Sequence, residues 1–281
     1  MSNRDIIQYD GNGKYLGRFS IPQGDNFTVY PAIYLNDSTY AAIIDAYDKS
    51  IPEYSVLIFN PSDSIKYLMP ITQQNQKYLI DIQQSDKDKL PPSMKDMVFV
   101  GMGTNIYRYK DSARVVFSYN DTIFSLSPDL KLQSAYIIHF GKTNKEKQAS
   151  LLRTPKESEG YLYLLFELKV FAHEPYEKVY TLKNGTVKSI SQTDCYALFN
   201  KKTGYFTLLN QPEMSMPGIN EDILSGPPFW PSSISSKGEL ITIYTVEELL
   251  KWKGTHKVSP KLAKIIESLG DLDNPVVVIA R

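Results

Sequence analysis

Apolar and polar positions alternate along this chain in short paired runs that are separated by turn-forming residues. The clearest pair lies in YNDTIFSLSPDLKLQSAYIIHFGK (119–142), where two runs rich in β-branched and aromatic residues flank a Ser-Pro-Asp turn. Three further stretches share this layout: IIQYDGNGKYLGRF (6–19), VLIFNPSDSIKYLMP (56–70) and YALFNKKTGYFTLL (196–209). Asn, Asp and Gly supply the side-chain bonding or the positive φ that tight hairpins need. Each stretch therefore predicts a β-hairpin.

The hairpins recur along the chain as copies of one unit. The residue before each turn is Tyr9, Phe59, Leu126 or Phe199, and a weaker fifth copy, LITIYTVEELLKW, places Tyr244 there. The intervals between these residues are 50, 67, 73 and 45, and further apolar runs lie between the hairpins. About four short strands in a period of roughly 40–50 residues are typical of a propeller blade, and insertions account for the longer intervals. A β-sandwich or two unrelated β domains is the alternative, because these folds also contain closely spaced short strands.

One segment near the C-terminus has helical rather than strand spacing. In SPKLAKIIESLG (259–270), Ser259 suits the N-cap, Pro260 the first helical position and Gly270 the end of a helix. We therefore expect an all-β fold: a β-propeller of four-stranded blades with one short helix near the C-terminus. It forms a single domain over 1–281, with blade hairpins near 6–19, 56–70, 122–140, 196–209 and 240–281.

The charge balance, the apolar runs and the cysteine content exclude several classes of partner and structure. The 31 basic and 31 acidic side chains cancel, so the chain has no strong field to hold a polyanion and we expect no nucleic-acid partner. No apolar run approaches the ~18 residues of a membrane span, so we expect no transmembrane segment. The opening SNRDIIQYD has no signal-peptide pattern.

The chain has a single cysteine, Cys195, which excludes an intrachain disulfide. Cys195 lies in a strand of alternating apolar and polar residues, which indicates an inert packed thiol.

Two motifs, INEDILSGPPFWP (219–231) and LGDLDNPVVVIAR (269–281), carry a resemblance to a known family. They resemble the C-terminal signature of the six-bladed, TolB-like β-propeller proteins of gut anaerobes, whose function is unassigned. The 119–142 stretch resembles a blade of that family, although Gln133-Ser134-Ala135 stands where a Pro-Arg pair is common. The resemblance implies a chain that is shortened at its N-terminus, and a ring of the six-bladed type that is incomplete or closes with five blades. It also implies a periplasmic or cell-surface location, since the relatives include lipoproteins.

The loop GPPFWP is the most distinctive candidate for a binding site. Its prolines stiffen the backbone and present an aromatic pair beside polar groups, an arrangement that suits stacking on a sugar ring. The alternative is that the aromatic pair fills the seam between blades. A cation on the strand SARVVFSY suits recognition of a carboxylate or sulfate, unless it is structurally paired. The expected ligand-binding residues are Phe229, Trp230, Asn220, Glu221, Asp222 and Arg114.

Metal and cofactor chemistry receive little support. Asp271, Asp273 and Asn274 offer oxygen ligands, but the same pattern is an ordinary turn before a strand. His139, His173 and His256 form no chelating pair, and no nucleophile or nucleotide-binding motif is present. We therefore expect no metal and no cofactor.

Two functions remain open at this level. The first is a binding or interaction module that holds a glycan, a peptide or a partner protein at the channel mouth. The alternative is a glycan-active lyase or hydrolase with charged residues in the central channel, and Glu221 with Asp222 would supply only part of the paired carboxylates it needs. A scaffold that has lost its activity is a third possibility. Convergence of three or more charged side chains would favour catalysis.

Overall fold

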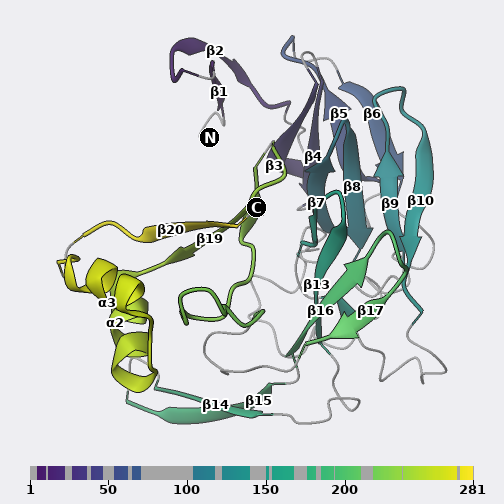
Figure 1. Ribbon diagram of the computed structural model, residues 1–281. Helices are drawn as coiled ribbons and strands as arrows, with labels where there is room; N and C mark the ends of the chain where they lie inside the picture. Colours follow the sequence, from purple (N-terminus) through teal and green to yellow (C-terminus); the bar gives the residue numbers. More distant parts are fainter. Residues whose placement is uncertain are drawn as a thin grey trace. The chain divides into compact units, whose positions relative to one another are not determined.

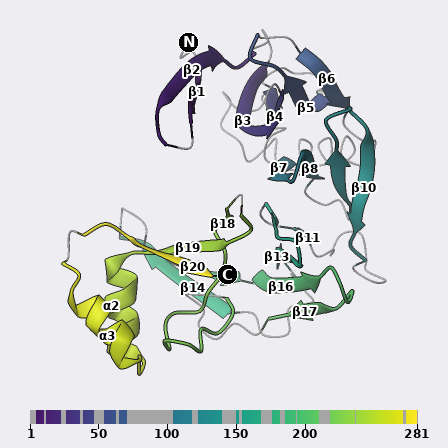
Figure 2. The same cartoon turned by 45° about the horizontal axis from the view of Figure 1, so that its top comes forward.

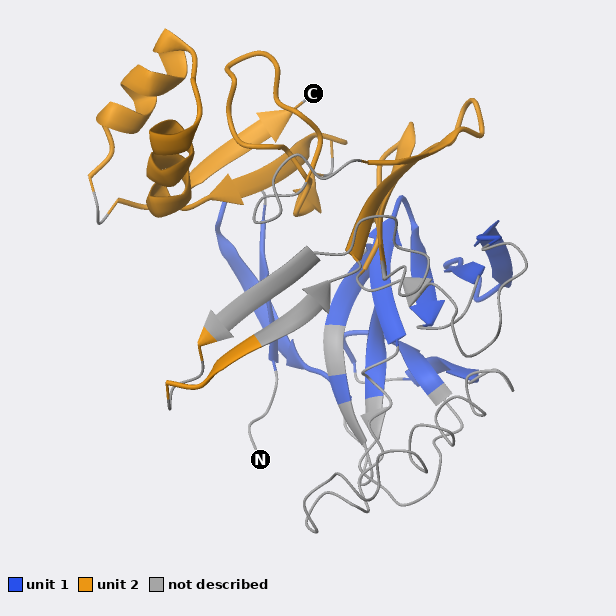
Figure 3. Cartoon of the chain, turned by 90° about the horizontal axis from the view of Figure 1, so that it is seen from below, with its two compact units in different colours: residues 1–150 blue, residues 151–281 orange. Residues whose placement is uncertain are grey.

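Antiparallel strands make up most of the described residues in the computed structural model of this chain, which divides into two compact units, residues 1–150 and 151–281 (Figure 3). The structure describes residues 5–10, 12–22, 27–36, 39–46, 54–62, 65–70, 104–117, 122–139, 150–151, 154–167, 176–181, 185–192, 194–209, 218–235, 237–270 and 273–280. Within these ranges, neither helix has the length and apolar content that a membrane span requires. Each unit is described below by itself.

The first unit contains three antiparallel sheets whose strands follow one another in chain order, β1-β2, β3-β4-β5-β6 and β7-β8-β9-β10 (Figure 1). Their bounds are β1 Asp5–Tyr9, β2 Tyr15–Ser20, β3 Phe27–Asn36, β4 Thr39–Ala46, β5 Tyr54–Phe59, β6 Ile65–Pro70, β7 Thr104–Tyr109, β8 Ser112–Phe117, β9 Thr122–Leu126 and β10 Leu132–Ile137. A four-stranded meander of this kind is the topology of a propeller blade. The hairpins predicted at 6–19, 56–70 and 122–140 are confirmed.

Turn chemistry explains why these hairpins form where the sequence predicts them. In the first one, Oδ1 of Asp10 accepts hydrogen bonds of 2.9 Å from the amides of both Asn12 and Lys14. Gly13 adopts a φ of 80°, which a residue with a side chain rarely tolerates. The turn is therefore specified by local contacts among Asp10, Asn12, Gly13 and Lys14.

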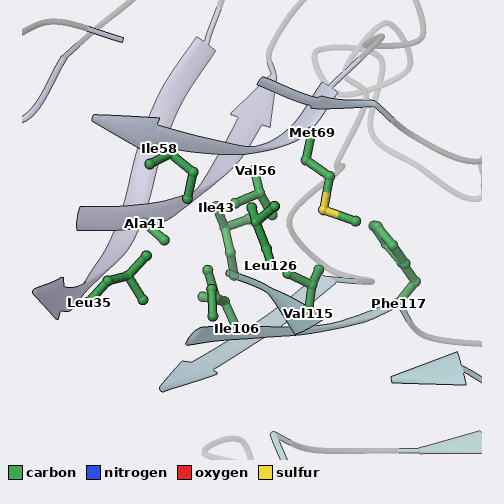
Figure 4. Close-up of a cluster of buried hydrophobic side chains, with 11 residues drawn as sticks. Leu35, Ala41, Ile43, Val56, Ile58, Met69, Ile106, Val115, Phe117 and Leu126 are labelled. Atoms are coloured by element: carbon green, nitrogen blue, oxygen red, sulfur yellow. The ribbon is translucent and has the colours of Figure 1, made fainter. Parts of the chain in front are cut away.

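The middle sheet of the first unit is buried on both faces. One face packs against the β7–β10 sheet (Figure 4), through Leu35, Ala41, Ile43, Val56, Ile58, Met69, Ile106, Ala113, Val115, Phe117 and Leu126. The other face, which includes Tyr40 and Phe59, packs against Ile6 and Phe19 of the β1–β2 hairpin. This double burial explains the continuous apolar runs in β4 and β5, because a strand covered on both sides needs no polar alternation. Successive sheets thus stack face to face, as blades do.

The second unit combines short sheets with two helices. Its strands are β11 Ser150–Leu151 at the boundary, β12 Lys156–Glu157, β13 Tyr161–Glu167, β14 Tyr176–Thr181, β15 Val187–Gln192, β16 Asp194–Asn200, β17 Phe206–Leu208, β18 Ser233–Ile234, β19 Leu240–Tyr244 and β20 Val276–Ala280. One sheet has the order β11-β13-β16-β17 with β12 also paired to β13, and the others are β14-β15 and β18-β19-β20. The hairpin predicted at 196–209 is confirmed as β16 and β17.

Two helices, α2 (Val246–Thr255) and α3 (Pro260–Glu267), follow β19 and precede β20 in the sequence, and they lie beside one end of that strand pair (Figure 2). Their buried side chains pack with Tyr244, Val276 and Val278. The predicted helix is confirmed as α3, with Ser259 as its N-cap. The interpretation of LITIYTVEELLKW as a fifth hairpin was wrong, because its second half is α2. Thr245 and Glu248 form a reciprocal capping box there, which starts a helix directly after the strand. In place of a tight hairpin, β19 pairs with β20 across both helices.

The prediction of an all-β fold built from propeller-type sheets is confirmed, and the described residues contain two short helices where one was predicted. The single domain over 1–281 and the number of blades stay predictions.

Candidate functional site

A loop of residues 218–231 in the second unit carries the predicted aromatic pair. Two backbone hydrogen bonds between Ile219 and Phe229 close it, at 2.8 Å from the Ile219 amide and 2.7 Å from the Phe229 amide. Gly218 lies where the returning backbone is closest, because a Cβ there would be 2.5 Å from the Phe229 carbonyl oxygen. Only glycine permits such an approach. The two hydrogen bonds thus close the loop and fix the backbone position of Phe229, which directly precedes Trp230.

The carboxylate of Glu221 holds this loop from within. Oε1 accepts hydrogen bonds of 2.9 Å from the amides of Ile223 and Leu224. Oε2 accepts bonds of 3.1 Å from the Leu224 amide and 2.7 Å from the Gly226 amide. Charge-assisted bonds of this kind are stronger than neutral ones. Both oxygens of Glu221 are therefore engaged by the loop's own backbone.

Three further hydrogen bonds fasten the loop to the helices and to β19. The hydroxyl of Tyr244 donates to the Pro228 carbonyl at 2.9 Å, and the indole N–H of Trp252 donates to the Ser225 carbonyl at 3.1 Å. The Ser259 amide donates to the Leu224 carbonyl at 2.9 Å. Burial of Tyr244, with smaller contributions from nearby carboxylates, raises the pKa of its phenol to about 12. The loop is anchored on its neighbours and loses little entropy when it contacts a ligand.

The two aromatic residues of the loop have different surroundings. Phe229 is buried, whereas Trp230 is half-buried and stands perpendicular to two tyrosines of the neighbouring sheet. The ring centroid of Trp230 lies 5.6 Å from that of Tyr163 on β13 and 4.6 Å from that of Tyr196 on β16. The indole N–H of Trp230 has no partner among the described residues and is not enclosed. Trp230 therefore offers an accessible hydrogen-bond donor within an aromatic group.

Strand register explains how these rings meet. Tyr163 pairs with Leu198 and Leu165 pairs with Tyr196, so both tyrosines point to the same side of the sheet. Tyr161, two residues before Tyr163, lies on this side as well and keeps 39% of its surface exposed. We call the group formed by Tyr161, Tyr163, Tyr196 and Trp230 the aromatic face.

The same face carries a cation. Lys156 on β12 pairs directly with Tyr163, so its side chain projects to the side of Tyr163. Burial lowers the pKa of the Lys156 ammonium below its ordinary value. Across the described residues, no carboxylate or carbonyl pairs with this ammonium. The aromatic face and Lys156 together form the candidate site.

The other residues predicted for ligand binding are placed as follows. Asn220 and Asp222 belong to the 218–231 loop and are exposed. Arg114 belongs to the first unit, on β8, where its Nη1 donates to Oγ of Ser125 and its guanidinium lies 5.1 Å from the ring centroid of Tyr109. The structure thus brings Phe229, Trp230 and the three polar residues into one loop, and places Arg114 in the first unit.

The candidates for metal or catalytic chemistry remain scattered in the described part of the chain, where no three His, Cys, Asp or Glu side chains gather to hold a metal ion. His139 is exposed, His256 stacks on Trp252 with centroids 3.6 Å apart, and Asp273 accepts a bond from the Gly270 amide. His173 and Asp271 lie outside the described residues. Burial raises the pKa of the half-buried Cys195 thiol, which keeps it protonated and unreactive.

Sequence reasoning missed Tyr163, Tyr196 and Lys156. The available signal was the alternation in GYLYLLFE and DCYALF, which puts every second residue on one face. Recognising the site also required the pairing of β12, β13 and β16, which joins residues far apart in the sequence.

No curated protein and no solved structure matches the chain. The family model described as "Domain of unknown function (DUF4934)" matches residues 1–281. Sheets of the blade type serve binding and interaction modules in general. On the strength of a match over all 281 residues, the chain belongs to the family Domain of unknown function (DUF4934).

Proposed function

We propose that this chain is a glycan-binding module whose ligand contacts the aromatic face through Trp230. The observation that carries the proposal is the half-buried indole, held by an anchored loop, with an accessible N–H donor. Aromatic rings with a polar edge suit a sugar, since the ring covers its apolar C–H surface while the N–H reaches a hydroxyl. A preorganised loop keeps the entropic cost of such binding low.

A glycan array probed with the full chain, followed by calorimetry on the best ligands, tests the proposal. Trp230→Ala should weaken binding by at least about tenfold, because loss of one well-placed aromatic contact costs on the order of 1.4 kcal/mol or more. Tyr205→Ala is the matched control, since Tyr205 lies in the same unit and is 75% exposed. Unchanged binding in the Trp230 variant, or binding of peptides without any glycan, would contradict the proposal.

The proposed setting follows the resemblance to six-bladed, TolB-like propellers of gut anaerobes. We propose that the sheets are blades of that type of ring and that the protein works in the periplasm or at the cell surface, where dietary and host glycans are met. Fractionation of the source cells, with an antibody against the chain, tests the location. Recovery in the cytoplasmic fraction would contradict it.

A further inference from the structure

Lys156 and Glu157 are neighbours on β12 and therefore project to opposite sides of the sheet. Glu157, whose side chain has no exposed surface, is neutralised by Lys201, with the ammonium 3.0 Å from its Oε1. The same ammonium donates to the Ser158 carbonyl at 2.9 Å. On that side of the sheet, the buried carboxylate of Glu157 is therefore balanced by the ammonium of Lys201.

On the aromatic side, the charge of Lys156 is not balanced in this way. Its ammonium is partly withdrawn from water, and the described part of the structure provides no counter-charge for it. Partial burial of an unpaired cation costs free energy that a pairing anion recovers. A ligand that carries an anion would supply the counter-charge of Lys156 and recover this free energy.

The position of Lys156 matches a ligand that also contacts Trp230. Directly opposed residues of an antiparallel pair have Cβ atoms about 5 Å apart, so Lys156 starts beside Tyr163. The ring of Tyr163 in turn lies 5.6 Å from that of Trp230. A lysine stem can span the width of one ring, which brings the ammonium to the edge of a sugar placed on the aromatic face.

We propose that the ligand of the aromatic face is an anionic sugar, whose carboxylate or sulfate group pairs with Lys156 while its ring lies against Trp230. This inference rests on the proposed glycan-binding function and names the class of glycan. The indole N–H of Trp230, which has no partner among the described residues, and the ammonium of Lys156 supply two donors near Tyr163, and a sugar acid supplies acceptors for both.

Calorimetry with the full chain and three oligosaccharides tests the inference: oligogalacturonate, its methyl ester, and a sulfated galactose oligosaccharide. The methyl ester keeps the backbone of the first ligand and removes its charge. We expect oligogalacturonate or the sulfated sugar, whichever carries the natural anion, to bind at least about tenfold tighter than the neutral ester. The stronger of the two charged ligands identifies the source of the anion.

Lys156→Met should lower affinity for the charged sugar by about tenfold and leave the neutral ester unaffected, while Lys156→Arg should retain most of the affinity. Lys202→Met is the matched control, because Lys202 is an exposed lysine of the same unit and should change nothing. Circular dichroism confirms that each variant is folded. Equal affinity of the wild type for charged and neutral sugars, or no effect of Lys156→Met, would overturn the inference and leave the glycan function standing. Absence of binding to every glycan would overturn both.

Discussion

The hydroxyl of Tyr244 donates a 2.9 Å hydrogen bond to the carbonyl oxygen of Pro228, which joins β19 to the loop that presents Trp230. The bond is buried, and burial of the phenol, with smaller contributions from Glu248 and Glu221, keeps it neutral up to high pH. The protonated form of Tyr244 is therefore one of the groups that hold the loop in place.

The pKa of about 12 for Tyr244 predicts an alkaline loss of stability. The unfolded phenol titrates near its ordinary value, about 10, so the protonated form favours folding below that pH. Its contribution is lost as the pH rises from about 10 to about 12, where the unfolded state releases a proton that the folded state keeps. Urea unfolding across this range should show a steeper decline for the wild type than for Tyr244→Phe. Parallel declines would show that the phenol does not titrate differently in the folded protein.

Removal of the Glu221 carboxylate should destabilise the 218–231 loop. Glu221→Ala leaves the amides of Ile223, Leu224 and Gly226 without their acceptor, at a cost of about 1–3 kcal/mol. Thermal unfolding monitored by tryptophan fluorescence measures the loss. Asp222→Ala is the control because Asp222 is the exposed neighbour, and its midpoint should stay close to that of the wild type. Equal midpoints for both variants would argue against the capping role.

A methyl group at Gly218 should be poorly tolerated. Its Cβ would lie 2.5 Å from the Phe229 carbonyl oxygen, so the two closing hydrogen bonds must lengthen or break. We expect Gly218→Ala to lower the free energy of unfolding by about 2 kcal/mol or more. Gly254→Ala gives a contrast of opposite sign: Gly254 lies in α2 with open space around its Cα, and alanine there should stabilise by about 0.5–1 kcal/mol. Denaturant titration of both variants measures the two signs.

The Glu157–Lys201 pair should behave as a buried ion pair. Lys201→Met removes the ammonium that lies 3.0 Å from Oε1 of a fully enclosed carboxylate, and breaking such a pair costs about 3–5 kcal/mol. The double variant Lys201→Met with Glu157→Gln should recover part of this loss, because the uncompensated charge is gone. A double-mutant cycle from urea unfolding gives the coupling, and simple additivity of the two single effects would contradict it.

The hairpins could be predicted from sequence because their causes are local. Asp10 and Gly13 fold their turn through contacts within a few residues, and the same holds for the Ser-Pro-Asp turn before Leu130. The helix α3 was equally visible through Ser259 and Pro260. The start of α2 was missed because an apolar strand runs straight into a capping box at Thr245, and the apolar periodicity alone did not separate them.

The site was only half visible in the sequence. Trp230 stood out because it lies in a proline-rich loop, but its partners Tyr163 and Tyr196 come from strands whose pairing no local pattern specifies. Glu221 looked like a ligand carboxylate, since a sequence does not show that its oxygens face amides of the next residues. Contacts that depend on register or on loop closure are decided by the folded unit as a whole.

The alternation of Lys156 and Glu157 along β12 makes this short strand sensitive to length changes in the bend that follows it. Deleting or inserting one residue between β12 and β13 would shift the pairing by one residue, so that each side chain of β12 projects to the opposite face of the sheet. Glu157 would then lie on the side of Tyr163, where we propose that an anion binds, and Lys156 would lie on the side of Leu162 and Lys201. In related sequences, the bend between β12 and β13 should therefore keep the same length even where its residues differ.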